Sequence, residues 1–168
     1  FKLVSELDAF NNERKDLENN LLNKIKSSIS DKASDSVIVL TGNNWHEGVI
    51  GIIASRIKDK YNKPTVIISI NNNIGKASAR SIAGFDIGKT IISAVQDKIL
   101  IKGGGHKMAG GFTINVNQIE NFKTFINKKF QTINIDINNQ KKLFIDSIIS
   151  PSALNIDFYE KVENLSPF

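Results

Sequence analysis

The sequence predicts an α/β fold in which helices flank a mixed β-sheet. Segments with apolar residues at helical spacing alternate along the chain with short apolar runs typical of buried strands. An asparagine run between two strand-like segments indicates a hairpin, which favours a mixed sheet over a purely parallel one. With 168 residues, the chain can bury one domain core and part of a second.

The first third of the chain contains two helical patterns separated by a strand. Residues 1–30 have apolar positions three, four and seven apart, which predicts one long amphipathic helix. A polar break over 31–35 precedes VIVL at 37–40, a short buried strand. Apolar residues then recur at helical spacing over 48–61, and Asn62-Lys63-Pro64 predicts the end of that helix.

The middle of the chain continues the alternation. TVIISI at 65–70 predicts a second core strand, followed by a turn at 71–73 and a paired strand near 76–81. A helical pattern covers 85–98, and a glycine-rich loop is expected after it. The segment ends with strand FTINV at 112–116 and a helix near 118–130.

After Thr132 the composition becomes more polar, with few apolar residues over 138–142. LFIDSII at 143–149 then indicates a strand, and the remainder indicates a break and a helix. These elements are too few to close a core, so we interpret them as the beginning of another domain.

Composition limits the function classes. Hydrophobic residues make up 40% and charged residues 23%, and no apolar run approaches the roughly 18–20 residues that would cross a bilayer. The chain opens with no signal-peptide pattern. The lack of cysteine excludes disulfides and thiolate metal sites, and it fits a reducing cytoplasm.

The net charge of +5 is weak evidence for nucleic-acid binding, because abundant lysine, asparagine and isoleucine indicate an AT-rich coding sequence. The same bias makes arginine informative. Only positions 14, 56 and 80 are arginine. An arginine kept in such a chain indicates a need for a planar, bidentate donor, for phosphate or for a buried carboxylate.

Three motifs could bind an anion. The first, NNWHEGVIGIIASRI, places Trp45, His46 and Glu47 at a strand-to-helix corner, followed by glycines that permit close approach. The second, KASARSIAGFD, puts Ser78 and Arg80 two residues apart, so both side chains leave a strand on one face and can bind phosphate together.

The third motif, GGGHKMAGG at 103–111, combines five glycines with one histidine. A glycine inside a helix or strand lowers stability by about 0.5–1 kcal/mol relative to alanine, so five of them indicate that bare backbone is needed here. We therefore predict that the N–H groups of Gly103, Gly104 and Gly105 and the imidazole of His106 approach anionic oxygens. AGFDIGKT at 83–90 resembles a P-loop, but it has one residue too few between its glycines.

The order of these motifs resembles the C-terminal part of the catalytic core of the bacterial RecJ family of single-strand-specific 5′-to-3′ DNA exonucleases. The GGGH motif alone resembles the wider DHHA1 domain, which oligoribonucleases, cyclic-dinucleotide phosphodiesterases and alanyl-tRNA synthetase also have. The tryptophan-histidine corner narrows the resemblance to RecJ. The resemblance implies that the chain consists of a linker helix from a missing DHH domain (1–32), a DHHA1 domain (33–135) and the start of a truncated OB-fold domain (136–168).

The resemblance also implies a division of labour. Manganese or magnesium would bind to aspartates and histidines of the absent DHH domain, so this fragment would hold no metal and would have no activity alone. Ser78 and Arg80 match the positions expected to hold the 5′ phosphate of single-stranded DNA, and Arg14 matches an arginine near the DNA path. His106, as the catalytic candidate, would face the scissile phosphate. A role in cytoplasmic DNA repair and recombination is implied, with a single-strand-binding protein or a helicase as partner.

Other interpretations remain open. The chain could belong to an oligoribonuclease or cyclic-dinucleotide phosphodiesterase, or it could be a non-catalytic nucleic-acid-binding module. His106 could brace its loop, and the glycines could serve only positive φ angles in a tight turn. Arg14 could simply pair with Glu18 four residues on, and a structural ion pair is favoured for Arg56.

Trp45 is expected in the core rather than stacked on a base. Adjacent residues such as His46 and Glu47 seldom converge on one metal ion, so we expect Trp45 and His46 to support the site from behind the residues that contact the substrate.

Overall fold

The computed structural model describes residues 2–32, 35–133, 145 and 147–164. The chain divides into two compact units, residues 1–136 and 137–168, and each is described by itself. Among the described residues, no helix combines the length and the apolar character needed to cross a membrane.

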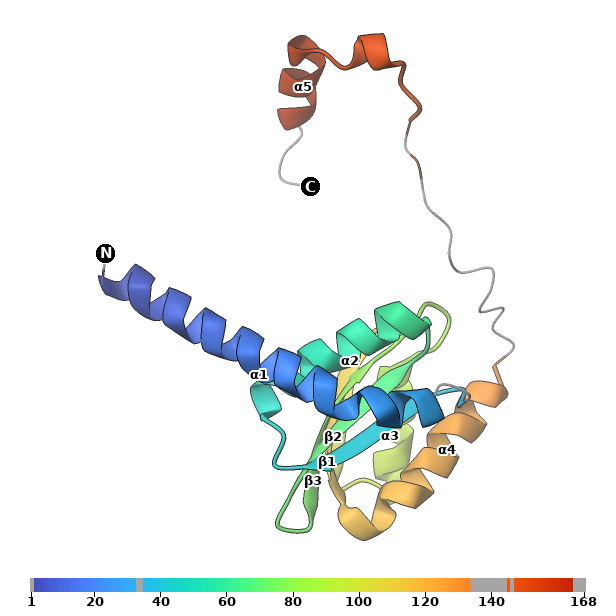
Figure 1. Cartoon of the computed structure of the whole chain (residues 1–168). Coiled ribbons are helices and arrows are strands. Elements are labelled where there is room, and N and C mark those ends of the chain that lie inside the picture. Colours follow the sequence, from blue (N-terminus) through green and yellow to red (C-terminus); the bar gives the residue numbers. More distant parts are fainter. Residues whose placement is uncertain (1, 33–34, 134–144, 146, 165–168) are drawn as a thin grey trace. The chain divides into compact units, whose positions relative to one another are not determined.

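The first unit alternates helices and strands, as expected (Figure 1). Its elements are α1 (Lys2–Lys32), β1 (Ile38–Asn43), α2 (Glu47–Tyr61), β2 (Thr65–Asn71), β3 (Ile74–Arg80), α3 (Ile87–Gln96), β4 (Lys102–His106), β5 (Ala109–Asn115), the 3₁₀ turn η1 (Val116–Gln118) and α4 (Ile119–Gln131). The single long first helix, the two core strands and the three later helices confirm the predicted elements to within a few residues.

The five strands form one mixed sheet in the order β1-β2-β3-β5-β4. The pairing of β1 with β2 is parallel, and the other three pairings are antiparallel. The mixed sheet predicted from the β2–β3 hairpin is therefore confirmed. Its turn contains Asn72 and Asn73 at φ 48° and 64°, the left-handed values that a tight hairpin turn requires and that asparagine tolerates.

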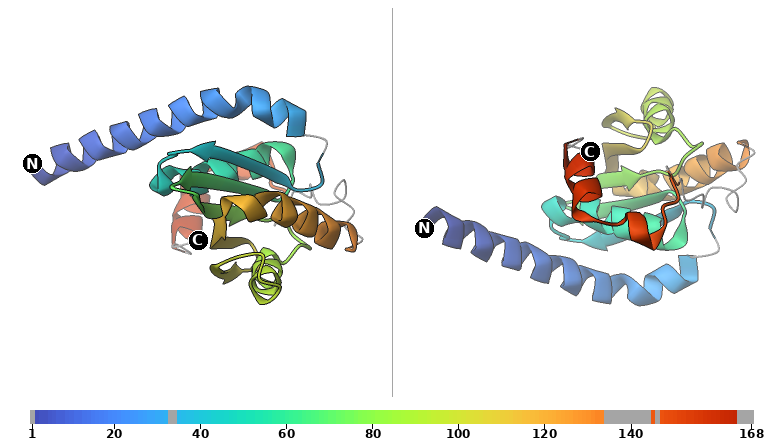
Figure 2. Two further views of the ribbon diagram at one scale, coloured as in Figure 1. Left: turned by 90° about the horizontal axis from the view of Figure 1, so that it is seen from below. Right: turned by 90° about the horizontal axis from the view of Figure 1, so that it is seen from above.

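Helices cover both faces of the sheet (Figure 2). Helices α1 and α2 lie on one face, where they bury a cluster with β1 and β2 that comprises Leu21, Ile25, Ile29, Ile38, Leu40, Val49, Ile50, Ile53, Ala54, Ile57 and Ile67. Helices α3 and α4 lie on the other face, where Phe112 of β5 packs on Phe122 of α4 with ring centroids 4.6 Å apart.

Local signals explain where the helices begin and end. The side chain of His46 accepts a hydrogen bond from the Gly48 N–H and caps α2, and the side chain of Asp86 accepts one from the Lys89 N–H and caps α3. Helix α2 ends at Tyr61, and its C-cap Asn62 adopts the left-handed conformation two residues before Pro64. The predicted stop at 62–64 is confirmed.

The glycine-rich segment differs from the prediction. It is not a loop, because residues 102–106 and 109–115 form the strands β4 and β5 of a hairpin. The expected strand at 112–116 accordingly begins three residues earlier. Nor do these glycines serve positive φ angles, since among the described glycines only Gly84 has one, at 88°.

The second unit is described only in part. Helix α5 (Ile156–Glu163) confirms the helix expected at the end of the chain, and Asn155 caps it by accepting a hydrogen bond from the Phe158 N–H. A short 3₁₀ turn, η3 (Pro151–Ala153), precedes it. The strand expected at 143–149 is not found in the residues of it that the structure describes, because 145 and 147–149 are in no strand; residues 143, 144 and 146 lie outside the described residues.

Candidate functional site

The sheet register aligns three cross-strand rows on the face that α2 borders. In antiparallel pairs, directly opposed residues project from the same face. Each row runs from β3 through β5 to β4. The rows are Lys76-Thr113-Lys102, Ser78-Gly111-Gly104 and Arg80-Ala109-His106. We call this nine-residue surface the sheet floor.

The sheet floor has little side-chain cover. Its middle row is Ser78-Gly111-Gly104, so no side chain covers the backbone of β5 and β4 in that row. A Cβ added to Gly104 would meet no atom within 4 Å. A hollow of about 550 Å³ opens above the floor, and Lys76, Ser78, Lys102, Gly111 and Thr113 belong to its lining.

Ser78 and Arg80 project together, as the two-residue spacing predicts. The Arg80 NH1 donates to Ser78 Oγ at 3.1 Å and to the Ala79 carbonyl at 2.9 Å. Among the described residues, no carboxylate pairs with Arg80, so the structural salt bridge considered as the alternative is not found there. The guanidinium retains donors that can bind an anion.

Helix α2 touches this pair through a glycine. A Cβ added to Gly51 would lie 3.1 Å from Arg80 NH2 and 3.1 Å from Ser78 Oγ. Contacts that tight oblige the neighbouring side chains to shift. Gly51 therefore permits the close approach that the sequence indicated, and any larger residue there would displace both polar groups.

The three glycines of GGGH have different surroundings. A Cβ on Gly103 would lie 2.6 Å from the Phe112 Cβ, and one on Gly105 would lie 2.5 Å from the Gly110 Cα. These two glycines are needed for packing against β5 and α3. Gly104, with open space above it, is the one whose bare backbone the protein's own packing does not require.

His106 ends β4 and shares its cross-strand row with Arg80, two strands away. At about 4.8 Å per strand, the two Cα atoms lie on the order of 10 Å apart. The imidazole is exposed, and in the part of the chain that the structure describes no hydrogen bond or ion pair holds it. The alternative that His106 braces its loop therefore has no contact to support it.

Backbone contacts fix the hairpin that carries His106. The Ser81 N–H donates to the Met108 carbonyl at 2.8 Å, and the Ile87 N–H donates to the Lys107 carbonyl at 3.2 Å. Gly88, at the start of α3, packs directly on the carbonyls of Gly105 and His106. The segment that resembles a P-loop thus supports the hairpin.

The corner at residues 45–47 is structural in its contacts. Trp45 is half-buried against the core cluster and covers Gly42, and its carbonyl accepts a 2.6 Å hydrogen bond from Ser69 Oγ. His46 caps α2, and Glu47 forms a 2.9 Å ion pair with Lys76. The described residues contain no group of three or more histidine, cysteine or acidic side chains placed to bind a metal ion.

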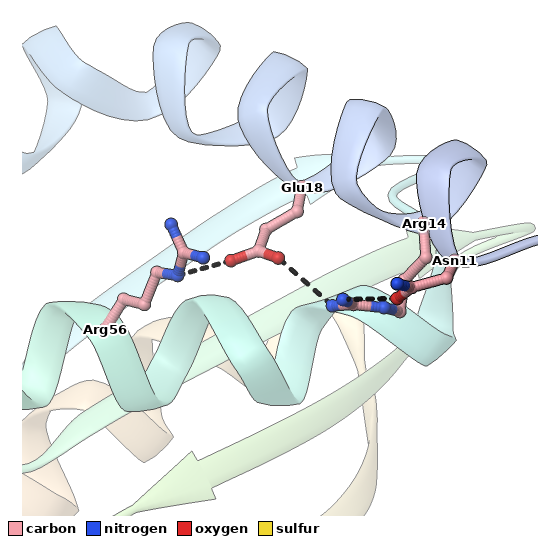
Figure 3. A network of polar contacts seen from close by, with 4 residues as sticks. All are labelled: Asn11, Arg14, Glu18 and Arg56. Atoms are coloured by element: carbon pink, nitrogen blue, oxygen red, sulfur yellow. Dashed lines mark hydrogen bonds and ion pairs between the residues drawn. The ribbon is translucent and has the colours of Figure 1, made fainter. Parts of the chain in front are cut away.

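Arg14 and Arg56 meet at one buried carboxylate (Figure 3). Arg14 NH1 pairs with Glu18 Oε2 at 3.2 Å, and Arg56 Nε pairs with Glu18 Oε1. The ion pair favoured for Arg56 and the i,i+4 pair considered for Arg14 are both confirmed. Arg14 nevertheless stays 40% exposed and lines a hollow of about 290 Å³ with His46 and Gly48.

The two phosphate-binding candidates approach α2 one turn apart. Arg14 shares its hollow with Gly48, and Arg80 reaches Gly51. Residues three apart on a helix are neighbours on its surface, so the two residues of α2 that these arginines approach lie one turn apart. Sequence analysis missed Lys102, which belongs to the floor; once β4 is known to be a strand, its spacing from Gly104 and His106 reveals it.

Comparisons with known proteins find a matching family model and several similar proteins. A family model described as the DHHA1 domain matches residues 34–132. The chain is 26% identical over 170 residues to the single-stranded-DNA-specific exonuclease RecJ of Bacillus subtilis and 28% identical over 172 residues to that of Haemophilus influenzae. These alignments cover 99% and 98% of the chain. The crystal structure of RecJ from Thermus thermophilus in complex with Mn²⁺ matches 99% of the chain with a TM-score of 0.81 and 27% identity.

The chain spans only part of these proteins. It covers 21% of the Bacillus subtilis protein, 30% of the Haemophilus influenzae protein and 24% of the Thermus thermophilus chain.

Proposed function

The chain belongs to the DHHA1 domain family, and from this premise we propose that it forms the phosphate-binding part of a single-stranded-DNA-specific 5′-to-3′ exonuclease of the RecJ type. The relatives described above support this substrate over an oligoribonucleotide or a cyclic dinucleotide. In this proposal residues 1–32 are a linker helix from a DHH domain, 33–135 are the DHHA1 domain and 136–168 begin an OB-fold domain.

The observation that carries the proposal is the Ser78–Arg80 pair on the sheet floor. A hydroxyl and a guanidinium without a carboxylate partner among the described residues are suited to a terminal phosphate. Each charged hydrogen bond contributes about 1.5–3 kcal/mol when shielded from water. Arg14, one helical turn along α2 from Arg80, would add a third donor.

The rest of the floor would guide the strand. The bare backbone at Gly104 and Gly111 leaves room for a sugar-phosphate chain, and Lys102 adds positive charge to the same face. His106 would contact the scissile phosphate from the far side of the floor. In this arrangement the 5′ phosphate and the reacting phosphate bind to different strands of one rigid sheet.

Hydrolysis itself would depend on a divalent metal ion outside this chain. The Thermus thermophilus enzyme has been crystallised with Mn²⁺ and with Mg²⁺. The described residues here do not fit such an ion, because they hold no suitable cluster of ligands. We therefore assign the manganese or magnesium site to a preceding DHH domain, and to this chain the binding and orientation of DNA.

The cellular role follows from the proposed substrate. Single-stranded DNA ends arise during repair and recombination in the cytoplasm, where a single-strand-binding protein or a helicase would expose them to the enzyme. These partners would act on the DNA path, and we assign no surface of this chain to them.

Arg80→Lys tests the proposal, because lysine keeps the charge but loses the planar donor fork. We expect the chain to bind a 5′-phosphorylated single strand more tightly than the same strand with a 5′ hydroxyl. Arg80→Lys should lower that preference by about tenfold, while affinity for both strands still falls as salt rises. Fluorescence anisotropy with two labelled oligonucleotides measures it. A preference unchanged in Arg80→Lys would remove Arg80 from the site.

A further inference from the structure

Glu18 is a buried carboxylate held between two arginines from different helices (Figure 3). Its side chain is 2% exposed, whereas those of Arg14 and Arg56 are 40% and 56% exposed. Arg14 lies on α1 with Glu18, and Arg56 lies on α2. A carboxylate this deeply buried is costly unless it is paired, so Glu18 depends on these two arginines.

One arginine would suffice to neutralise Glu18 and join the helices. Arg56 already does both, because its Nε pairs with Oε1 across the α1–α2 contact. Oε1 accepts no hydrogen bond from the described residues, so the ion pair with Arg56 is its sole polar contact there. The second arginine leaves the network of two cations and one anion with a net charge of +1.

Of the two arginines, Arg14 is the one whose guanidinium is fixed at two points. Its NH1 donates to Glu18 Oε2 at 3.2 Å, and its NH2 donates to Asn11 Oδ1 at 3.0 Å. Both acceptors lie on α1, so the group is held in one orientation beside Gly48 at the start of α2. Holding a flexible side chain in its binding geometry removes part of the entropy cost of binding.

We propose that Glu18 is a positioning residue for Arg14, and that Arg56 is the counter-cation that leaves Arg14 available to an anion. Arg56 balances the charge of the carboxylate, so Glu18 can orient Arg14 without neutralising it. This inference rests on the proposed function, since the anion is the terminal phosphate of single-stranded DNA bound by Ser78 and Arg80.

The test compares the affinities of the chain for 5′-phosphorylated and 5′-hydroxyl oligonucleotides. Glu18→Gln raises the net charge by one, so a pure charge effect would tighten binding of both strands. Positioning predicts a different result: affinity for the 5′-hydroxyl strand stays or rises, while the preference for the 5′ phosphate falls by about tenfold, the equivalent of one charged hydrogen bond.

Arg56→Gln provides a second test, which keeps the Glu18 side chain but removes the cation that pairs with its Oε1. We expect it to lower the preference, because Glu18 would then neutralise Arg14. Lys60→Gln is the matched control: it removes the same charge from the same helix, outside the network, and should leave the preference unchanged. In an Arg14→Gln background, Arg56→Gln should cause no further loss, because its effect passes through Arg14.

The outcomes separate the inference from the proposed function. A wild-type preference that depends on Arg80 and Arg14 but is unchanged in folded Glu18→Gln and Arg56→Gln overturns the inference alone. A further loss of the 5′-phosphate preference when Arg56→Gln is added to Arg14→Gln also overturns the inference. A wild-type chain with no preference at all overturns both. If thermal melting shows that Glu18→Gln is unfolded, Arg56→Gln and the double variant decide.

Discussion

Gly104 and Gly105 are adjacent residues with opposite surroundings. An added Cβ would enter open space at Gly104, but at Gly105 it would strike the backbone of Ala109 and Gly110. The difference follows from strand alternation, because the two residues face opposite sides of the sheet. One glycine is therefore available to a ligand, and the other is required by the hairpin.

Alanine substitution should mainly lower stability at Gly105 and mainly weaken DNA binding at Gly104. Gly104→Ala should change the free energy of unfolding by less than about 0.5 kcal/mol, whereas Gly105→Ala should lower it by about 1–3 kcal/mol through overpacking. Gly104→Ala should nevertheless weaken binding of single-stranded DNA by narrowing the floor. Urea unfolding and fluorescence anisotropy on the same samples measure both. Normal DNA affinity in Gly104→Ala would make its bare backbone functionally irrelevant.

At this scale the sequence predicted contacts that depend on local spacing. Strand alternation put Ser78 and Arg80 on one face, and helical spacing identified Glu18 as a partner of Arg14. It did not predict that Arg56 would share Glu18, because that ion pair joins residues 38 positions apart on two helices. The row that aligns His106 with Arg80 depends on the register of three strands, which spacing within one strand cannot reveal.

Among the elements, α3 and the β4–β5 hairpin form a tightly fitted pair. A Cβ on Gly88 of α3 would lie 2.8 Å from the Gly105 carbonyl oxygen and 2.9 Å from that of His106. Both oxygens belong to the backbone, so neither can rotate away as a side chain would. Helix α3 therefore fixes the position of the hairpin, and with it the position of His106, relative to the other strands of the sheet.

Gly88→Ala should push the hairpin away from α3. We expect a loss of about 1–3 kcal/mol in the free energy of unfolding and a shift of the His106 amide and ring signals in heteronuclear NMR spectra. Gly48→Ala is the matched control, because its Cβ would meet only the flexible His46 ring, at 3.1 Å. Identical His106 signals in wild type and Gly88→Ala would show that α3 does not position the hairpin.

In the first unit, element prediction failed where propensity and pairing disagree. Three successive glycines have poor strand propensity and no apolar alternation, so β4 had no local strand signal. Its pairing with β5, and the packing of Ile91 against Gly103 and Gly110, provide the stabilisation instead. The other elements of the first unit carry apolar periodicity or caps and were predicted to within a few residues.

For the molecule as a whole, the chain should bind DNA without cutting it. With Mn²⁺, it should release no nucleotides from 5′-labelled single-stranded DNA above background, because its described residues contain no metal-ligand cluster. Release of labelled nucleotides, separated by gel electrophoresis, measures this. Robust release that His106→Ala abolishes would reveal a complete active site within these 168 residues.

We expect the long helix α1 to act as a lever whose pivot is Glu18. The side chains that bury it, Leu21, Ile25 and Ile29, all lie on the C-terminal side of that pivot, while Leu3, Leu7 and Phe10 are exposed. Sixteen residues at 1.5 Å each separate Glu18 from Lys2, a lever arm of about 24 Å. A tilt of about 10° at the pivot would move the first turn by about 4 Å. Small changes in the arginine network would thus be magnified at the far end of the helix.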